Sequence, residues 1–239
     1  MGVSEVKYLQ RARLASWALM VGAIVNCSFL VEGYVGSELN RRTSFISELS
    51  ANGQPAQTFY RLSDLIAGTL LVIGGLACYR LLPDSPWVRI GDLSAVVVGL
   101  ITAVNSFVPL DCTPSVSETC RAAEKAGQVS MSHEIHNVTG ILEPIFGVAA
   151  LVLIGIGLWR LRRSRRLPPQ WTGLAPFLIL VAALYGLMAL LIAVIYLFND
   201  PGGLGLAQRL QIVLYGSAIF AIGLVMRHYY DQESKRPDG

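Results

Sequence analysis

The chain has 239 residues, of which 53% are hydrophobic and only 15% are charged, whereas a typical soluble domain carries about 25% charged residues. Its mean hydropathy is +0.52, and its apolar residues gather in long blocks, which excludes an ordinary soluble domain and favours an integral membrane protein. The net charge of +3 comes from clustered arginines with no basic surface interleaved with aromatic residues, which argues against nucleic acid as a partner.

Six apolar blocks are long enough to cross a bilayer, since a helix needs about 20 apolar residues to span the hydrocarbon core. The blocks are uninterrupted rather than alternating, which predicts helices and not the strands of a barrel. We therefore expect an all-α, polytopic six-helix bundle that forms a single membrane domain over residues 1–239. Its spans are expected at about 15–34, 60–82, 89–109, 134–160, 172–198 and 207–229. The first block is too long for the apolar region of a cleaved signal, so we expect it to stay as a signal anchor.

The orientation of the bundle follows from its cations, because cytoplasmic loops of membrane proteins are enriched in Lys and Arg. With the N-terminus inside, 13 of the 19 Lys and Arg residues lie on the inner side, including the run 161–166 and Arg236. The other six are Arg41, Arg42, Arg61, Arg121, Lys125 and Arg209. The pattern predicts a multi-pass protein of the cell membrane with both termini cytoplasmic and two long outer loops, 35–59 and 110–133.

The four cysteines agree with this sidedness. Cys27 and Cys78 fall inside expected spans, where they behave as small buried hydrophobes. Cys112 and Cys120 fall in the second outer loop, where an oxidising compartment favours a disulfide. The alternative is a pair of free thiols.

Two histidines stand at the start of the fourth expected span. His133 and His136 are three residues apart, which puts both imidazoles on one helix face, close enough to share a metal such as zinc or a proton network. A third ligand would be Asp111 or Glu48, and a metal-bound water would be a nucleophile near neutral pH. The alternative is a pair of interfacial histidines that bond to loop carbonyls and water.

Arg209 is a lone cation at the outer end of the last span. An Arg–carboxylate pair is the favoured way to hold such a charge in a partly dry place, and we expect the partner to be Glu48 or Asp111. Lipid phosphates are the alternative partner. Glu48 lies in the stretch SFISELSANGQP, whose apolar residues predict that the loop packs onto the bundle. Its carboxylate should therefore point inward, towards Arg209 or a histidine.

Three further polar residues lie within expected spans, where such groups mark sites or packing contacts. They are Asp64, Asn105 and Glu143. Glu143 precedes Pro144, which removes a helical hydrogen bond and favours a kink. Glu143 would then line a cavity or make a hydrogen bond between helices.

The stretch RTSFISELSANGQPAQTFYRLSDLIAGTLLVIGG resembles the signature of a prokaryotic membrane family known as domain of unknown function 998. Members of that family have six helices and an S-x-x-S-E-L-G-A-like first outer loop, and this chain has Ser50 where a Gly is more usual. The resemblance extends to Pro55 and Phe59, to Phe107-Val108-Pro109-Leu110-Asp111 with a following His, and to Gly205-Leu206-Ala207-Gln208-Arg209. The first loop is also distantly similar to the Frag/DRAM/Sfk membrane proteins, which are linked to autophagy modulation and lipid remodelling. The resemblance implies the fold and the place of the site, and carries no established biochemistry.

These residues support three functions. The favoured one is a lipid- or partner-binding accessory protein of the cell envelope, in which the outer polar cluster clasps the two loops onto the bundle. The first alternative is a metal-dependent or acid/base hydrolase or transferase that acts on a lipid or lipid-linked substrate. In that enzyme, His133, His136, Asp111 and Glu48 would be ligands or acid–base groups and Arg209 would orient a phosphate. The second alternative is a small transporter.

Overall fold

The structure is a computed structural model that describes residues 3–198 and 202–235. Its described part is all-helical and contains no strand. The α-helices are α1 (Val3–Val25), α2 (Gln57–Cys78), α3 (Pro86–Asn105), α4 (Glu118–Lys125), α5 (Met131–Arg163), α6 (Leu174–Leu197) and α7 (Leu204–Glu233). Three short 3₁₀ helices join them, namely η1 (Ser28–Val31), η2 (Ser47–Ser50) and η3 (Pro169–Trp171). The all-α prediction is therefore confirmed. Arg236 lies outside the described residues.

Five helical segments of the described chain are long and apolar enough to cross a membrane. They are α2, α3, α5, the segment Pro169–Leu197 that contains α6, and α7. α1 carries Lys7, Arg11 and Arg13 in its first half and is not among them. The structure thus supports five spans by length and composition, and the sixth stays a prediction.

The first expected span, 15–34, does not form one helix. α1 ends at Val25, the chain turns at residues 26–27, and η1 follows. Asn26 and Ser28 carry short polar side chains, which compete for backbone hydrogen bonds and favour turns over helix interiors. This early end matters because η1 leads directly into Glu32, whose side chain is buried against α7.

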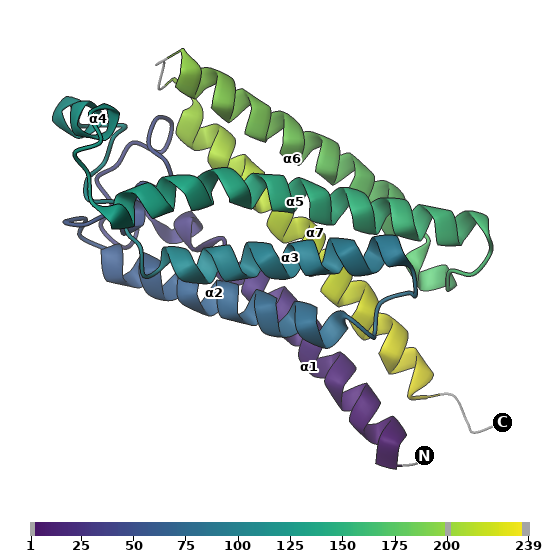
Figure 1. The fold of residues 1–239 in the computed structure, drawn as a ribbon. Helices are drawn as coiled ribbons and strands as arrows, with labels where there is room; N and C mark the ends of the chain where they lie inside the picture. Colours follow the sequence, from purple (N-terminus) through teal and green to yellow (C-terminus); the bar gives the residue numbers. More distant parts are fainter. Residues whose placement is uncertain (1–2, 199–201, 236–239) are drawn as a thin grey trace.

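The six long helices form a closed ring. α2 and α7 both pack against α1, α3 packs against α2 and α5, and α6 packs against α5 and α7. Figure 1 shows the first turn of α1 and the last turn of α7 at one end of the bundle, together with the α2–α3 and α5–α6 connections. We call this end the termini end. The opposite end, with α4, η2 and the segments 26–56 and 106–130, is the loop end.

The α2–α3 contact depends on two glycines. A Cβ atom added to Gly68 would lie 2.4 Å from the backbone nitrogen of Ala103 and 2.5 Å from the carbonyl oxygen of Gly99. The two backbones can approach this closely only because neither Gly68 nor Gly99 has a side chain, as is common where helices pack within membranes.

Arginines stack on tryptophans near the termini end. Arg160 lies 4.6 Å from the ring centre of Trp87, Arg163 lies 4.0 Å from that of Trp159, and Arg227 lies 5.2 Å from that of Trp17. Tryptophan belts mark the interfaces of membrane proteins, and cationic side chains gather on the cytoplasmic side.

Candidate functional site

The first long loop packs down onto the bundle. Leu49 of η2 is buried with Phe29 of η1 and Tyr60 of α2 in a small apolar core, and Ile46 packs against it. This explains why a connector between two spans carries the apolar side chains of SFISELSANGQP. The inward packing predicted for this loop is confirmed.

Glu48 has no exposed side-chain surface. Its carboxylate accepts a hydrogen bond from the Phe45 backbone N–H at 2.9 Å and one from the Ser115 backbone N–H at 2.6 Å. The Ser115 hydroxyl also donates to this carboxylate, and it lies 2.9 Å from the hydroxyl of Ser44. Burial raises the pKa of Glu48, and the hydrogen bonds from Ser115 act in the opposite direction. The carboxylate therefore ties the first loop to the second.

The prediction that Glu48 pairs with Arg209 or a histidine was wrong, because its carboxylate accepts hydrogen bonds from backbone N–H and hydroxyl groups instead. Arg209 is also buried, and it makes a bidentate ion pair with Glu32. Its Nε lies 3.1 Å from Oε1 of Glu32 and its Nη2 lies 2.6 Å from Oε2. Arg41 adds a second cation, with its Nε 2.9 Å from Oε1 of Glu32. Neither Glu48 nor Asp111 pairs with Arg209.

The remaining donors of Arg209 hold the backbone of the first loop. Its Nη1 donates to the carbonyls of Arg41 at 3.0 Å, Ser44 at 2.9 Å and Gly205 at 3.1 Å. One residue earlier, the side-chain oxygen of Gln208 accepts the Ile46 backbone N–H at 2.6 Å. The start of α7 is thus the anchor of the first loop.

Gly205 completes this anchor because it allows the loop to come close. Its backbone N–H donates to the carbonyl of Arg42 at 3.0 Å. A Cβ atom added at Gly205 would lie 2.2 Å from the carbonyl oxygen of Ser44, so no other residue type fits without displacing the loop. The spacing G-x-x-Q-R therefore brings three contacts with the first loop together in about one helical turn.

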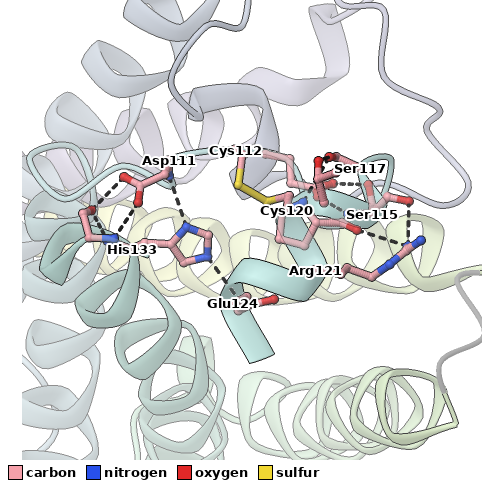
Figure 2. Close-up of a disulfide and its surroundings, with 12 residues drawn as sticks. Asp111, Cys112, Ser115, Ser117, Cys120, Arg121, Glu124 and His133 are labelled. Atoms are coloured by element: carbon pink, nitrogen blue, oxygen red, sulfur yellow. Dashed lines mark hydrogen bonds and ion pairs between the residues drawn. A yellow bond between two sulfur atoms is a disulfide. The ribbon is translucent and has the colours of Figure 1, made fainter. Parts of the chain in front are cut away.

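Asp111 and His133 lie together at the start of α5 (Figure 2). The Asp111 carboxylate accepts the backbone N–H of Ser130 at 2.6 Å and its hydroxyl at 2.7 Å. These two bonds lower the pKa of Asp111. The backbone N–H of Asp111 donates to Nδ1 of His133 at 3.2 Å, so Nδ1 is an acceptor and the ring proton lies on Nε2.

The other nitrogen of His133 faces α4. Its Nε2 lies 3.4 Å from Oε1 of Glu124, which also accepts the side-chain amide of Asn137 at 2.7 Å. The imidazole of His136 points elsewhere, with its Nδ1 2.8 Å from the carbonyl oxygen of Val108. The two histidines are therefore on one helix but serve two different loop contacts.

The predicted disulfide between Cys112 and Cys120 is confirmed. It links the segment after Asp111 to α4, and Figure 2 shows it between the Asp111–His133 contact and the residues Ser115 and Arg121. Ser117 begins α4 by accepting the backbone N–H of Cys120 at 3.1 Å. The disulfide and this cap hold Glu124 towards His133.

No three His, Cys, Asp or Glu side chains of the described residues lie together as metal ligands would. The Asp111 carboxylate is bonded to Ser130, and each histidine uses its Nδ1 in a contact with backbone. Zinc binding by His133, His136 and Asp111 stays a prediction.

The polar residues predicted within the spans make contacts between helices. Oδ1 of Asn105 accepts the hydroxyl of Thr139 at 2.6 Å, and Oε1 of Glu143 accepts that of Thr102 at 3.2 Å. Both bonds join α3 to α5, and α5 continues through Pro144. Asp64 lies in α2 and its side chain is half-buried. Of the two interpretations of Glu143, the hydrogen bond between helices is the one observed.

A pocket of about 350 Å³ opens at the loop end, where α4, the first loop, the end of α6 and the start of α7 meet. Its lining includes two cations, a carboxylate, two aromatic rings and two aliphatic hydroxyls, contributed by Arg121, Lys125, Glu124, Phe45, Tyr196, Ser115 and Thr43. None of the five predicted catalytic residues lines it. Glu48 and His133 instead hold two residues that do, Ser115 and Glu124.

Sequence reasoning missed the residues of this pocket and the role of Glu32. The only signal for Glu32 was an acidic side chain at the end of an apolar block, a feature that Asp64 and Asp111 share. Arg121 and Lys125 were counted only as outer cations, and nothing in the sequence joined them to Tyr196, which is 71 residues from Lys125.

A family model described as "Protein of unknown function (DUF998)" matches residues 13–225. This is the family suggested by the loop and helix-start motifs, and the match covers most of the chain. No curated protein and no solved structure matches the chain. The similarity to the Frag/DRAM/Sfk proteins stays a prediction.

Proposed function

Because the chain belongs to the DUF998 family, whose function is unknown, we propose a function from the site itself: the protein binds a lipid headgroup in the pocket at the loop end. One observation carries the proposal, namely two cations and two aromatic rings around one 350 Å³ pocket beside a helix end with exposed apolar side chains. The ligand class is a phosphate-bearing lipid or lipid-linked molecule.

The cations fit the phosphate. Arg121 is held at the pocket by its Nη1, which donates to the carbonyl of Pro114 at 3.2 Å. Lys125 lies one turn further along α4, on the same wall. Hydrogen bonds to charged groups contribute about 1.5 to 3 kcal/mol each, which is about tenfold in affinity or more.

The aromatic wall fits the glycerol and upper acyl region of a lipid. The ring centroids of Phe45 and Tyr196 lie 6.4 Å apart, and both rings line the pocket, Phe45 from the first loop and Tyr196 from α6. Beyond Tyr196, Leu197 and Phe198 are 76% and 79% exposed. An exposed apolar surface next to a polar pocket is the arrangement expected for a site that a lipid enters from the bilayer.

The test is retention of an anionic phospholipid by protein purified in detergent, measured by native mass spectrometry. The Arg121→Gln, Lys125→Gln double variant should retain at least tenfold less lipid than wild type. Arg42→Gln is the matched control, since Arg42 is an exposed cation at the same end that does not line the pocket. Equal retention by the double variant and the control would rule out headgroup binding at this pocket.

The proposed orientation places the loop end outside the cell membrane and both termini in the cytoplasm. It rests on the excess of Lys and Arg at the termini end, the Arg–Trp stacks there and the disulfide at the loop end. A membrane-impermeant thiol reagent should label Asn52→Cys in intact cells and should not label Ser164→Cys. The reverse pattern would overturn the orientation.

A second candidate, acid–base hydrolysis or group transfer on the bound lipid, rests on the contact between His133 and Glu124. Glu124 lines the pocket, and its Oε1 lies 3.4 Å from Nε2 of the buried His133. A carboxylate backed by an imidazole is a competent general base. Proteoliposomes that hold mixed phospholipids should then release a product that Glu124→Gln abolishes. Lipid that stays intact with the wild-type protein would exclude this candidate for the lipids tested.

A further inference from the structure

A second, much smaller cavity lies inside the bundle, towards the termini end. Its volume is about 20 Å³, and α1, α2, α3, α5 and α7 all contribute to its lining. Ten residues line it, and only two of these have a polar side chain, Asp92 of α3 and Tyr215 of α7. Asp92 lies six residues after the start of α3, or about 9 Å along the axis of the helix, and this helix is long and apolar enough to cross a membrane.

Both polar side chains are unsatisfied within the described protein. Oδ2 of Asp92 and the hydroxyl of Tyr215 are buried and have no hydrogen-bond partner. Asp92 is only 4% exposed and Tyr215 only 3%. An unpaired buried polar group costs about 1 to 3 kcal/mol, so two of them around one cavity call for a shared ligand.

The size and chemistry of the cavity select that ligand. A buried water needs a cavity of at least about 10 to 15 Å³ and two to four polar partners. This cavity, at about 20 Å³, is large enough for one water and offers it two polar side chains. Mg²⁺ and Ca²⁺ take six or more oxygen ligands, while the lining offers two oxygen-bearing side chains. The remaining lining is apolar, from residues such as Leu71 and Ile154.

No cation neutralises Asp92 within the described residues. Asp92 acts electrostatically on Cys78 of α2 and on Tyr215 of α7, Glu143 of α5 also acts on Tyr215, and none of these groups is cationic. Arg11 of α1 acts on Cys78 and donates to the carbonyl of Leu76 at 3.4 Å, without an ion pair to Asp92. An ionised, unpaired carboxylate in such a place costs several kcal/mol.

We propose that this cavity is an internal binding site for one water molecule that bridges Oδ2 of Asp92 and the Tyr215 hydroxyl, with the Asp92 carboxyl group carrying a proton. Loading the site needs no other reactant, since a hydronium ion gives its proton to the carboxylate and leaves a water molecule. The site is separate from the headgroup pocket, which lies at the other end of the bundle.

The site also has polar neighbours towards the loop end. The Tyr215 ring lies 5.7 Å from that of Tyr185 on α6. A Cβ atom added at Gly147 of α5 would lie 2.6 Å from the Tyr185 hydroxyl, one helical turn after Glu143. Glu143 is thus one carboxyl group to be distinguished from Asp92 in any measurement, and the buried Glu32 and Glu48 at the loop end are two others.

Infrared difference spectroscopy of the protein in lipid bilayers tests the site at neutral pH. Asp92→Asn should remove a carbonyl stretch of a protonated carboxylic acid, and Tyr215→Phe should shift that band because the bridging water loses a partner. Glu143→Gln should leave the band in place. Ser94→Ala controls for a change on α3, since the Ser94 hydroxyl bonds within its own helix to the carbonyl of Ile90 at 2.9 Å.

Two outcomes would overturn the proposal. A spectrum that Asp92→Asn leaves unchanged would show that the carboxyl group is ionised. A thermal stabilisation of the wild type by Na⁺ or Li⁺ over choline, lost in Asp92→Asn, would make the cavity a cation site. If Asp92→Asn does not fold, the band shift in Tyr215→Phe and an experimental density map of the wild-type protein test the proposal instead. An empty cavity between the two side chains would contradict the bridging water.

Discussion

Replacing Arg209 with Gln tests whether the start of α7 holds the first loop. Arg209 makes two hydrogen bonds to Glu32 and three to backbone carbonyls, and all five are lost or weakened. Breaking a buried ion pair by removing one partner costs about 3 to 5 kcal/mol, because the other charge stays buried without a partner. Arg41, which also contacts Glu32, is 61% exposed in its side chain and so offsets only a small part of this cost.

Thermal unfolding in lipid nanodiscs is the assay. For a chain of 150 to 250 residues, 1 kcal/mol shifts the Tm by about 2 to 4 °C, so Arg209→Gln should lower the Tm by about 6 to 20 °C. Arg42→Gln, a change of the same type on an exposed side chain, should shift it by about 1 °C, as surface substitutions usually do. Limited proteolysis should also cut the segment 33–44 earlier in Arg209→Gln than in the control.

The pairing itself is tested by a double-mutant cycle with Glu32→Gln. If the two side chains contact each other, the double variant should be more stable than the sum of the two single losses implies. Additive losses, or a Tm for Arg209→Gln close to that of Arg42→Gln, would refute the assignment of this pair as the main anchor of the loop.

Four other changes test the rest of the site and the fold. Reducing the Cys112–Cys120 disulfide, which spans a sequence separation of 8, should lower stability by about 2 to 3 kcal/mol from loop entropy. The loss is measured by thermal unfolding with and without a reductant. The Cys112→Ser, Cys120→Ser double variant is the control, and the reductant should not change its stability. Gly68→Val should cost about 1 to 3 kcal/mol by overpacking the α2–α3 contact, whereas Gly140→Ala, with nothing within 4 Å of the added Cβ, should be neutral or stabilising. Burial raises the pKa of Glu48 above its ordinary value of 4.5, so the folded protein binds the proton more tightly and stability falls as pH rises from 4.5 through the raised value. Glu48→Gln should abolish this dependence of stability on pH. A dependence equal to that of the wild type would show that Glu48 does not cause it. Metal analysis of the purified protein tests whether His133 and His136 bind zinc, with His133→Ala and His136→Ala measured beside the wild type. An equal metal content in all three proteins would show that neither histidine is a zinc ligand.

The helices could be predicted because the bilayer imposes them. An apolar block of about 20 residues has few alternatives to a helix in lipid, and the structure contains helices over all six blocks. The end of α1 could not be read in this way, since Phe29, Leu30 and Val31 continue the apolar pattern beyond the turn. Hydropathy measures burial in lipid or protein and does not distinguish an α-helix from a 3₁₀ helix that packs against α2.

Ion-pair partners were beyond the sequence for a different reason. Glu32, Glu48 and Asp111 all carry a carboxyl group and all lie at the loop end, so depth and charge alone could not decide which one pairs with Arg209. The choice depends on the path of the loop, in which Ser115 and Ser130 satisfy two of the carboxylates and leave Glu32 for the cation. Neither serine had any feature that singled it out.

The motifs that identify the family and the pocket that suggests a function share only Thr43 and Phe45 of the first loop. The first-loop motif and the G-x-x-Q-R motif meet in one hydrogen-bond network through Arg209 and Gln208, and Glu48 extends this network to the second loop. These residues fix the walls of the pocket without facing its interior. The ligand would instead meet Arg121, Lys125 and Tyr196, which lie outside both motifs. Substitutions in the motifs should therefore change stability more than ligand preference, and substitutions at the pocket should change ligand preference without unfolding the bundle.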